Sequence, residues 1–173
     1  MLCLKKYAFR FVICGNLKKY TAMTDFSEEA GQIIERYKRR TRKDQSNYYN
    51  LASASCAISH FEKNRRLVDI LAKNFGYDFI NKQYLEVGCG TGTNLCNLVS
   101  LGVNPSNLYG NDIFEPSLNT AQTRLPQTVH FQKGNFLDCN YDNQQFDVVL
   151  FSTVLSSILD QNFQVECLKY SYN

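Results

Sequence analysis

Apolar residues recur at helical spacing in the first half of the chain, and they predict two helices there. The first runs from about residue 25 to residue 43, with Asp25 or Thr24 as its N-cap and Ile33, Ile34 and Tyr37 on its apolar face. Its last turns contain the stretch RYKRRTRK, whose cations complement the helix dipole. These cations form either a solvated helix end or a site for phosphate or another anion.

The second helix is predicted over residues 54–75, and Gly76 supplies its C-cap. Its expected apolar face consists of Ile58, Phe61, Leu67, Ile70 and Leu71. Together, the two helices are expected to form a helical cap over residues 23–82, ahead of a second region at residues 83–173.

From residue 82 onward, short apolar runs alternate with segments that suit a helix. Strands are predicted at residues 82–89, 107–113, 129–132 and 146–152, and helices at residues 93–101 and 115–125. The run FDVVLFS is almost continuously apolar, which is typical of a strand covered on both faces. Strands that alternate with helices indicate an α/β fold with a parallel sheet and helices on both faces.

The composition is that of an ordinary globular domain, with 44% hydrophobic and 20% charged residues in a chain of 173. The charge is distributed unevenly. Residues 1–84 carry 16 Lys and Arg against 8 Asp and Glu, whereas residues 85–173 carry 3 against 8. The basic half could face an anionic partner, and the acidic half suits a cationic or hydroxyl-rich ligand.

Seven cysteines are spread along the chain without a CxxC pair, and only two histidines accompany them. Zinc sites and disulfide frameworks need closer, regular spacing, so the sequence predicts neither. Reduced thiols are typical of a cytoplasmic protein, which is the expected compartment. No run approaches the ~18 apolar residues of a transmembrane helix.

Residues 1–22 are expected to form an N-terminal extension outside the domain. Their opening, MLCLKKYAFRFVICG, resembles a signal peptide only faintly, because Lys5, Lys6 and Arg10 interrupt the apolar region. A well-formed helix start follows Met23, so Met1 and Met23 are both candidate first residues.

The stretch LEVGCGTGTNL places three glycines two residues apart, between a predicted strand and a predicted helix. Such a loop brings backbone N–H groups close to a ligand, because glycine has no side chain to block the approach. The dinucleotide fingerprint GxGxxG would need glycine at Thr93, and the GKS or GKT of a P-loop is absent. Glu86, two residues before Gly88, is unfavourable beside a pyrophosphate but suits a ligand with an ammonium group.

The same stretch closely resembles the (D/E)xGxGxG motif of the class I S-adenosylmethionine-dependent methyltransferases. Three further stretches follow in the order of that family, namely NLYGNDI, GNFLDC and FDVVLFSTVLSSILD. The resemblance covers about residues 36–164. It implies a Rossmann-like fold, S-adenosyl-L-methionine as the cofactor, and methyl transfer as the activity.

The resemblance also implies the roles of individual residues. Asp112, at the end of NLYGNDI, would accept hydrogen bonds from the ribose hydroxyls, as an acid does in dinucleotide folds. Asn135 stands where the family usually has Asp and keeps a carbonyl acceptor for the adenine amino group, and Phe136 suits packing against the adenine. The expected cofactor-binding residues are Glu86, Gly88, Cys89, Gly90, Gly92, Asn94, Asp112, Ile113, Asn135, Phe136 and Ser152. No catalytic residue is assigned, because a direct displacement needs alignment more than it needs a base.

Several of these residues also have a purely structural interpretation. Glu86 could be a strand-end charge and Asp112 a helix cap. Tyr48 and Tyr49 could cover the methionine end of the cofactor or simply pack. A group of hydroxyls could either cap backbone ends or line a ligand site where the last strand ends, and it comprises Ser152, Thr153, Ser156 and Ser157.

The family fold has seven strands, whereas the pattern here predicts four, and only residues 161–173 follow the last motif. Those residues suffice for one short helix, so the sheet is expected to be incomplete, with residues 146–152 as an exposed apolar edge open to self-association. The alternatives to an active enzyme are a non-catalytic cofactor-binding fragment and a partner-dependent module. An NAD-type oxidoreductase is disfavoured by Thr93 and Glu86.

No motif identifies the methyl acceptor. The positive first helices favour a phosphorylated or carboxylated small molecule. Aromatic and basic residues are not interleaved in the manner of nucleic-acid-binding proteins, so a nucleic acid is the less favoured acceptor.

Overall fold

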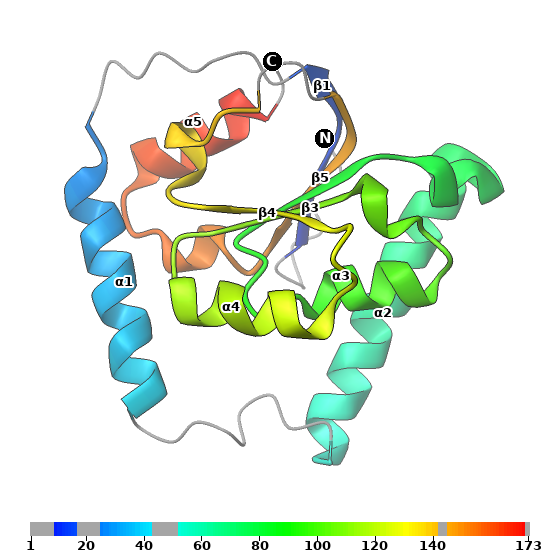
Figure 1. Cartoon of the computed structure of the whole chain (residues 1–173), viewed down its shortest axis with the longest axis horizontal. Helices are drawn as coiled ribbons and strands as arrows, with labels where there is room; N and C mark the ends of the chain where they lie inside the picture. The colour runs from blue at the N-terminus through cyan, green and yellow to red at the C-terminus, as the bar shows by residue number, and fades with distance from the viewer. Residues whose placement is uncertain (1–8, 17–24, 43–51, 142–144, 172–173) are drawn as a thin grey trace.

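A computed structural model of the protein describes residues 9–16, 25–42, 52–141 and 145–171. Its centre is a five-stranded sheet in the order β1-β5-β2-β3-β4 (Figure 1). The strands are β1 (Phe9–Asn16), β2 (Tyr84–Val87), β3 (Leu108–Asp112), β4 (His130–Lys133) and β5 (Gln145–Ser152). The helices are α1 (Ser27–Arg42), α2 (Ala54–Phe75), α3 (Thr93–Ser100), α4 (Glu115–Arg124) and α5 (Gln161–Tyr170).

Four of the strands are parallel and are linked through helices. Strand β2 pairs in parallel with β3 on one side and with β5 on the other, and β3 pairs in parallel with β4. From β2 the chain runs outward through β3 to β4, and it then crosses back to the other side of β2 to form β5. The carboxyl ends of β2, β3 and β5 meet at this switch point, where open α/β sheets bind their ligands.

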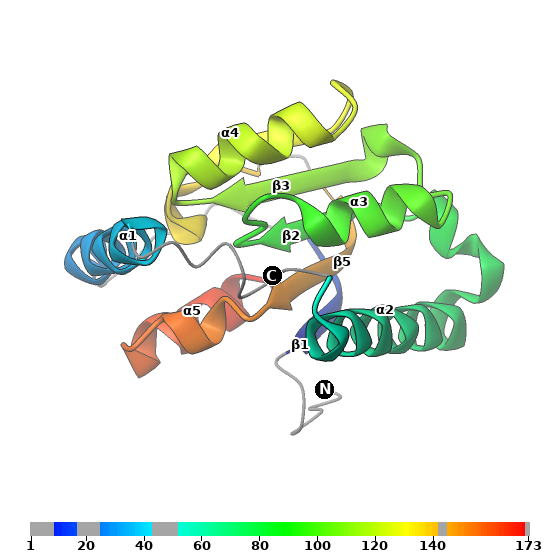
Figure 2. The same cartoon turned by 90° about the horizontal axis from the view of Figure 1, so that it is seen from below.

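Helices cover both faces of the sheet, with α1 and α5 on one side and α2 and α3 on the other (Figure 2). Each side has its own apolar core. Leu85 and Val87 of β2 pack in the core that contains residues of α1 and α5, whereas Tyr84 packs in the core of α2, α3 and α4. This alternation follows from the two-residue period of a strand, and it directs the Glu86 side chain toward α2 and α3.

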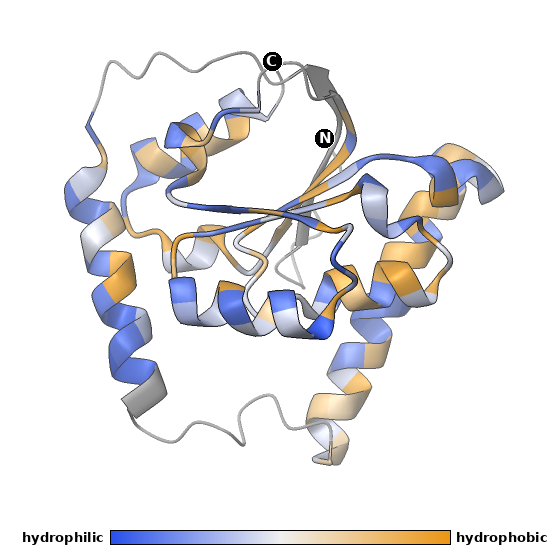
Figure 3. Cartoon of the chain, in the orientation of Figure 1, coloured by the Kyte–Doolittle hydropathy of each residue, from blue (hydrophilic) through white to orange (hydrophobic). Residues whose placement is uncertain are grey.

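The predicted elements after residue 25 agree with the structure. The N–H of Ser27 donates to Asp25 Oδ1 at 2.8 Å ahead of α1, and Gly76 follows α2 with a φ of 59°. Strand β5 is buried on both faces, since Val148 and Leu150 pack in one core and Val149 in the other. The hydrophobic colouring in Figure 3 follows this strand, whereas α1 and α4 are largely hydrophilic.

The N-terminal residues differ from expectation. Residues 9–16, expected to stand outside the domain, form β1 and pair antiparallel with β5 from Phe9 opposite Ser152 to Asn16 opposite Gln145. The sheet thus has a fifth strand, and β5 is an interior strand rather than the exposed edge predicted from the sequence. The aromatic and β-branched run FRFVIC explains the pairing, because such residues favour strands.

The apolar face predicted for α2 is buried only in part. Leu67 and Leu71 are each 1% exposed, but Ile58 is 69% exposed and Phe61 is 65% exposed. The N-terminal end of α2 projects beyond the sheet in Figure 1, so no described helix or strand covers its first turns. Tyr48, Tyr49, Met1 and Met23 lie outside the described residues.

Candidate functional site

The glycine loop lies at the carboxyl end of β2 and leads into α3. Gly88, Gly90 and Gly92 all have positive φ, at 66°, 55° and 77°. The loop is held by backbone bonds, since Cys89 N donates to Asn111 O at 2.8 Å and Gly92 N donates to Cys89 O at 2.9 Å. Residues with side chains rarely adopt this conformation, so the backbone conformation of the loop by itself accounts for the three alternating glycines.

The three glycines differ in what surrounds them. A Cβ added at Gly88 would lie 2.5 Å from Val154 Cγ2, and one added at Gly92 would lie 2.7 Å from Leu125 Cδ1. Nothing lies within 4 Å of a Cβ added at Gly90. Packing therefore requires glycine at the first and third positions, whereas the space beside Gly90 is open to a ligand.

Asp112, the last residue of β3, is fixed by two backbone amides. Its Oδ2 accepts from Gly90 N at 2.8 Å, and its Oδ1 accepts from Phe114 N at 2.7 Å. Burial raises the pKa of this carboxyl group, and the bonds from Phe114 and Gly90 oppose that shift. Because a carboxylate has about four acceptor positions, Asp112 retains capacity for two further hydroxyl donors.

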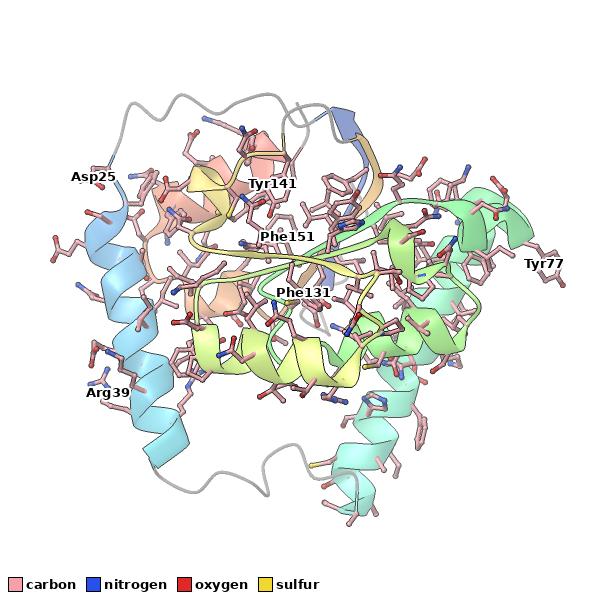
Figure 4. The ribbon with its side chains drawn as sticks, viewed as in Figure 1. Asp25, Arg39, Tyr77, Phe131, Tyr141 and Phe151 are labelled. Carbon is pink, nitrogen blue, oxygen red and sulfur yellow. The ribbon has the colours of Figure 1, made fainter. Side chains whose placement is uncertain are left out.

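A pocket lies against the ends of β2, β3 and β5 on the face covered by α1 and α5. Five of the expected cofactor residues line it, namely Gly88, Asp112, Ile113, Asn135 and Phe136. The other expected residues do not line it: Glu86, Cys89, Gly90, Gly92, Asn94 and Ser152. The ring of Phe151, labelled in Figure 4, also lines the pocket from the sheet.

The site residues that sequence reasoning missed include four from the helices over this pocket. Ile33 and Tyr37 line it from α1, and Phe163 and Cys167 line it from α5. The Tyr37 ring stacks on Phe114, with 5.8 Å between the ring centroids. The helical spacing of Ile33 and Tyr37 was visible in the sequence, but the pattern could not show which core they enter.

Asn135 is occupied by local bonds. Its Oδ1 accepts from Leu137 N at 3.3 Å, and its Nδ2 donates to Asp138 Oδ2 at 3.0 Å. The amide oxygen therefore caps the 3₁₀ turn Phe136–Asp138 and has one acceptor position left. That position suits a single donor such as an exocyclic amine.

Glu86 and Asn94 face α2 on the other side of the sheet from the pocket. Glu86 is 1% exposed, and its Oε1 accepts from Asn94 Nδ2. Burial raises the pKa of Glu86 to about 8, against the effects of Asn94 and of the positive charge of Lys63. Two buried oxygens, Glu86 Oε2 and Asn94 Oδ1, have no hydrogen-bond partner among the described residues.

The segment after β5 turns sharply beside the glycine loop. Ser152 is buried, and Thr153 adopts a φ of 63°, which is unusual for a β-branched residue. The hydroxyl of Thr153 donates to Ser152 O at 2.6 Å, and that of Ser156 donates to Thr153 O at 2.6 Å. Local backbone bonds thus account for two of the hydroxyls that the sequence offered as a ligand group.

An ion pair connects α1 to this same segment. Arg36 Nη2 donates to Glu29 Oε1 at 2.7 Å and to Ser157 O at 3.0 Å. Glu29 Oε1 also accepts from Leu159 N at 2.8 Å. Both side chains are largely buried, at 19% exposed for Arg36 and 11% for Glu29. The contact fixes α1 over the pocket that Ile33 and Tyr37 line.

Within the described ranges, no group of three or more His, Cys, Asp or Glu side chains could hold a metal ion. Burial raises the pKa of the Cys89 thiol, with the negative charges of Glu86 and Asp112 adding to the effect, which disfavours its thiolate form. No helix in the described part of the chain is long and apolar enough to cross a membrane.

Comparison with known proteins gives one family and a group of similar folds. A methyltransferase domain family matches residues 85–171, which are 87 of the 173 residues. The type II methyltransferase M.VspI of Vibrio sp. (strain 343) is 29% identical over 107 residues, which cover 54% of this chain and 26% of that protein.

Two solved methyltransferase structures share the fold. The plantazolicin methyltransferase BpumL, solved with a pentazolic desmethylPZN analog and SAH, has a TM-score of 0.60 and 19% identity, over 85% of this chain and 56% of that chain. The magnesium protoporphyrin IX methyltransferase ChlM of Synechocystis PCC 6803, solved with bound SAM, has a TM-score of 0.62 and 16% identity, over 89% and 75%. The chain spans 26% of the length of the curated relative and 56% of BpumL.

Proposed function

The chain belongs to the methyltransferase domain family, and from this premise we propose that it binds S-adenosyl-L-methionine and transfers its methyl group to a small anionic molecule. The observation that carries the proposal is the arrangement around Asp112. Two backbone amides fix this buried carboxylate at the mouth of an apolar pocket, beside a glycine loop with open space at Gly90.

The residues present match the adenine, the ribose and the amino-acid end of S-adenosyl-L-methionine. The free acceptor positions of Asp112 match the two ribose hydroxyls. Phe136 and Ile113 provide an apolar surface for the adenine, and Asn135 offers one acceptor to its amino group. The unpartnered oxygens of Glu86 and Asn94 match an ammonium group.

S-adenosyl-L-methionine, when bound, would supply a methyl group on a positively charged sulfur, which is a good leaving group for direct displacement by an acceptor atom. The chain then has to align the acceptor with the methyl group and exclude water. Helix α1 and the segment after β5 do this, because Arg36 and Glu29 hold them together over the pocket. No side chain is required as a general base when the acceptor atom is already ionised.

The acceptor class rests on the charge around the pocket. The outer side of α1 carries Arg39 and Arg40, and Arg40 lies over the Tyr37 ring at 5.2 Å from its centroid. Figure 4 shows Arg39 on the solvent side of this helix. Because Arg40 lies over a ring that lines the pocket, its positive charge favours a carboxylated or phosphorylated acceptor. The relatives act on different acceptors, so the acceptor is proposed from this chain's own charges.

Calorimetric titration with S-adenosylhomocysteine tests the cofactor site. We expect saturable binding that Asp112→Ala weakens by roughly 10-fold or more, since a hydrogen bond to a charged group contributes about 1.5–3 kcal/mol. Asp69→Ala is the control, because Asp69 lies on the exposed side of α2. Clear binding of NADH without binding of S-adenosylhomocysteine would contradict the proposal and favour an oxidoreductase.

Transfer is tested with S-adenosylmethionine that carries a labelled methyl group. Mixtures of small carboxylic acids and phosphate esters are compared with duplex DNA as acceptors. Label in the acidic small molecules supports the proposed acceptor class, whereas label in DNA alone would replace it. Binding without transfer to either would leave a cofactor-binding module.

A further inference from the structure

Asn111 of β3 is a buried polar side chain on the face of the sheet that α1 and α5 cover. It is 2% exposed, and strand alternation directs it to the same face as Tyr109, which packs against the core of that layer. Strands covered on both faces are usually apolar at such positions. Because a buried amide is costly unless it is hydrogen-bonded, the partners of Asn111 show what its polarity is used for.

The side-chain nitrogen of Asn111 holds the chain where it leaves β4. Nδ2 donates to Gln132 O at 3.1 Å and to Gly134 O at 3.0 Å, and it also contacts Cys139 Sγ at 3.2 Å. The two carbonyl oxygens can use both hydrogens of the amide, and they set its orientation. The Asn111 amide therefore fixes the turn that leads from β4 into Asn135.

The backbone of the same residue holds the glycine loop. Asn111 O accepts from Cys89 N at 2.8 Å. One residue thus contacts two loops that border the pocket, the glycine loop through its backbone and the segment after β4 through its side chain. A substitution at Asn111 removes the second contact and leaves the first in place.

The segment held by the Asn111 side chain carries the residue proposed to recognise the base. Asn135 Nδ2 donates to Asp138 Oδ2 at 3.0 Å, so the amide nitrogen is engaged within the segment. Asn135 Oδ1 accepts from Leu137 N at 3.3 Å and keeps one acceptor position. An oxygen in that place favours a base with an amino group over a base with a carbonyl oxygen.

Resting on the proposed function, we infer that Asn111 is a positioning residue that gives the cofactor site its selectivity for an amino-substituted purine. By holding Gly134, it sets where the Asn135 oxygen meets the amino group of the base. Asn111 acts through Asn135, and Asp138 fixes which end of the Asn135 amide faces the ligand. The ribose contacts of Asp112 do not depend on the Asn111 side chain.

Three ligands separate recognition of the base from recognition of the ribose. S-adenosylhomocysteine has the amino group and both ribose hydroxyls. S-inosylhomocysteine has a carbonyl oxygen in place of the amino group, and the 2′-deoxy form of S-adenosylhomocysteine lacks one hydroxyl. Calorimetric titration of the full chain gives a base ratio, which is the affinity for S-adenosylhomocysteine over that for S-inosylhomocysteine. It also gives a ribose ratio, which is the affinity for S-adenosylhomocysteine over that for its 2′-deoxy form.

We expect a wild-type base ratio of roughly 5- to 100-fold, because the inosine form leaves the Asn135 oxygen without a donor. Asn111→Leu has a similar size but no donor, and it should bring the base ratio close to one while the ribose ratio stays at the wild-type value. Asp138→Ala, at an exposed position, lets the Asn135 amide turn and should also bring the base ratio close to one. Asp69→Ala, on the exposed side of α2, should change neither ratio.

Hydrogen exchange measured by mass spectrometry reports the position of the segment directly. Asn111→Leu should raise exchange at residues 134–139 and leave β2 and β5 unchanged. If Asn111→Leu does not unfold cooperatively in urea, Asn111→Thr takes its place, because it keeps one hydroxyl donor. Its base ratio should lie below the wild-type value.

The outcomes separate this inference from the proposed function. An unchanged base ratio in the folded Asn111 variant overturns the role of Asn111 and leaves the cofactor site standing, even if the affinity for all three ligands falls. A parallel loss of the base and ribose ratios shows a general loosening of the pocket and also overturns it. Failure of the folded wild-type chain to bind S-adenosylhomocysteine overturns the proposed function and this inference together.

Discussion

At the scale of single residues, the three loop glycines have separate roles, and substitution distinguishes them. Gly90→Ala places a residue with a side chain in the left-handed region, which costs about 1–2 kcal/mol, and its methyl group enters the open space beside Asp112. We expect the chain to fold, with a modest loss of unfolding free energy in urea, and to lose at least roughly 10-fold in affinity for S-adenosylhomocysteine.

Two other glycines serve as controls for this prediction. Gly88→Ala should destabilise the fold more strongly, because its Cβ would lie 2.5 Å from Val154 Cγ2. Gly31→Ala, in α1 with no atom within 4 Å of the added Cβ, should stabilise the chain by about 0.5–1 kcal/mol. Unchanged affinity in Gly90→Ala would show that the ligand does not approach the loop at this point.

Glu86 gives the folded chain a characteristic dependence on pH. Burial raises its pKa from 4.5 to about 8. At a pH between these two values, the folded chain therefore keeps a proton on Glu86 that the unfolded chain has already released. The contribution to stability is complete below pH 4.5 and is lost as the pH rises through about 8. We expect the unfolding free energy of the free chain, measured in urea, to fall over this interval.

Glu86→Gln is the matched variant for the pH series, since it keeps the shape and one acceptor but does not titrate. Its unfolding free energy should fall less steeply over the same interval. Asp112, whose pKa is also raised by burial, remains in both chains and contributes equally to each. Identical slopes in the two chains would mean that Glu86 is ionised in the folded state despite its burial.

At the scale of elements, a single substitution can weaken the contact between α1 and the segment after β5 without changing another helix or strand. Arg36→Met removes the donor to Glu29 Oε1 and Ser157 O, and among the described residues it leaves a largely buried carboxylate with the Leu159 amide as its hydrogen-bond donor. We expect a loss of about 1–3 kcal/mol in unfolding free energy. Affinity for S-adenosylhomocysteine should fall as well, because Ile33 and Tyr37 line the pocket from this helix.

The comparison for α1 is Lys38→Met. Lys38 pairs with Glu35 on the exposed side of the helix, with 48% and 62% of the side chains accessible. Such a pair contributes less than about 1 kcal/mol, so stability and affinity should both remain near the wild-type values. An equal effect of the two substitutions would show that general helix charge, rather than the contact with the segment after β5, holds α1.

Helix α2 offers a second prediction, because its apolar face is divided. Leu67→Ala removes a side chain that is 1% exposed and should cost about 2–5 kcal/mol, whereas Phe61→Ala removes one that is 65% exposed. We expect the latter to change the urea midpoint of the isolated chain very little. A large loss of stability in Phe61→Ala would mean that this face is covered in solution.

Helix α2 also shows what the hydrophobic pattern of the sequence can predict and what it cannot. Periodicity and cap residues predicted α2 from Ala54 to Phe75 with Gly76 as its C-cap, as the structure has it. Periodicity cannot show where a helix extends past its sheet, so it predicted burial for the exposed Ile58 and Phe61.

The site was predictable to a similar degree. Asp112 and the glycine loop follow from local motifs. The approach of Lys63 to Glu86 does not, because only the packing of α2 against α3 brings the two together across 23 positions of the sequence. Likewise, the run FRFVIC has strand-forming composition, but its partner β5 lies far along the chain, so composition alone did not place it in the sheet.

At the scale of the whole molecule, the arrangement of the sheet brings the two parts of the site together. Strand β2 carries Glu86 toward one layer of helices and Val87 toward the other, and Gly88 follows at the switch point between β3 and β5. A ligand at this edge can reach the apolar pocket on one face and the Glu86 side chain on the other. The site therefore depends on β2 being held between two neighbours.

Strand β1 completes this arrangement, because it covers the outer edge of β5. A chain that begins at Met23 lacks β1 and exposes the backbone donors and acceptors of a strongly apolar strand. We expect the shortened chain to associate with increasing concentration in sedimentation velocity, and to unfold at a lower urea concentration. Removal of residues 1–8 alone keeps β1 and should leave both properties as in the full chain. If the chain from Met23 stays monomeric with an unchanged urea midpoint, β5 does not need β1, and residues 1–22 act as an extension outside the domain.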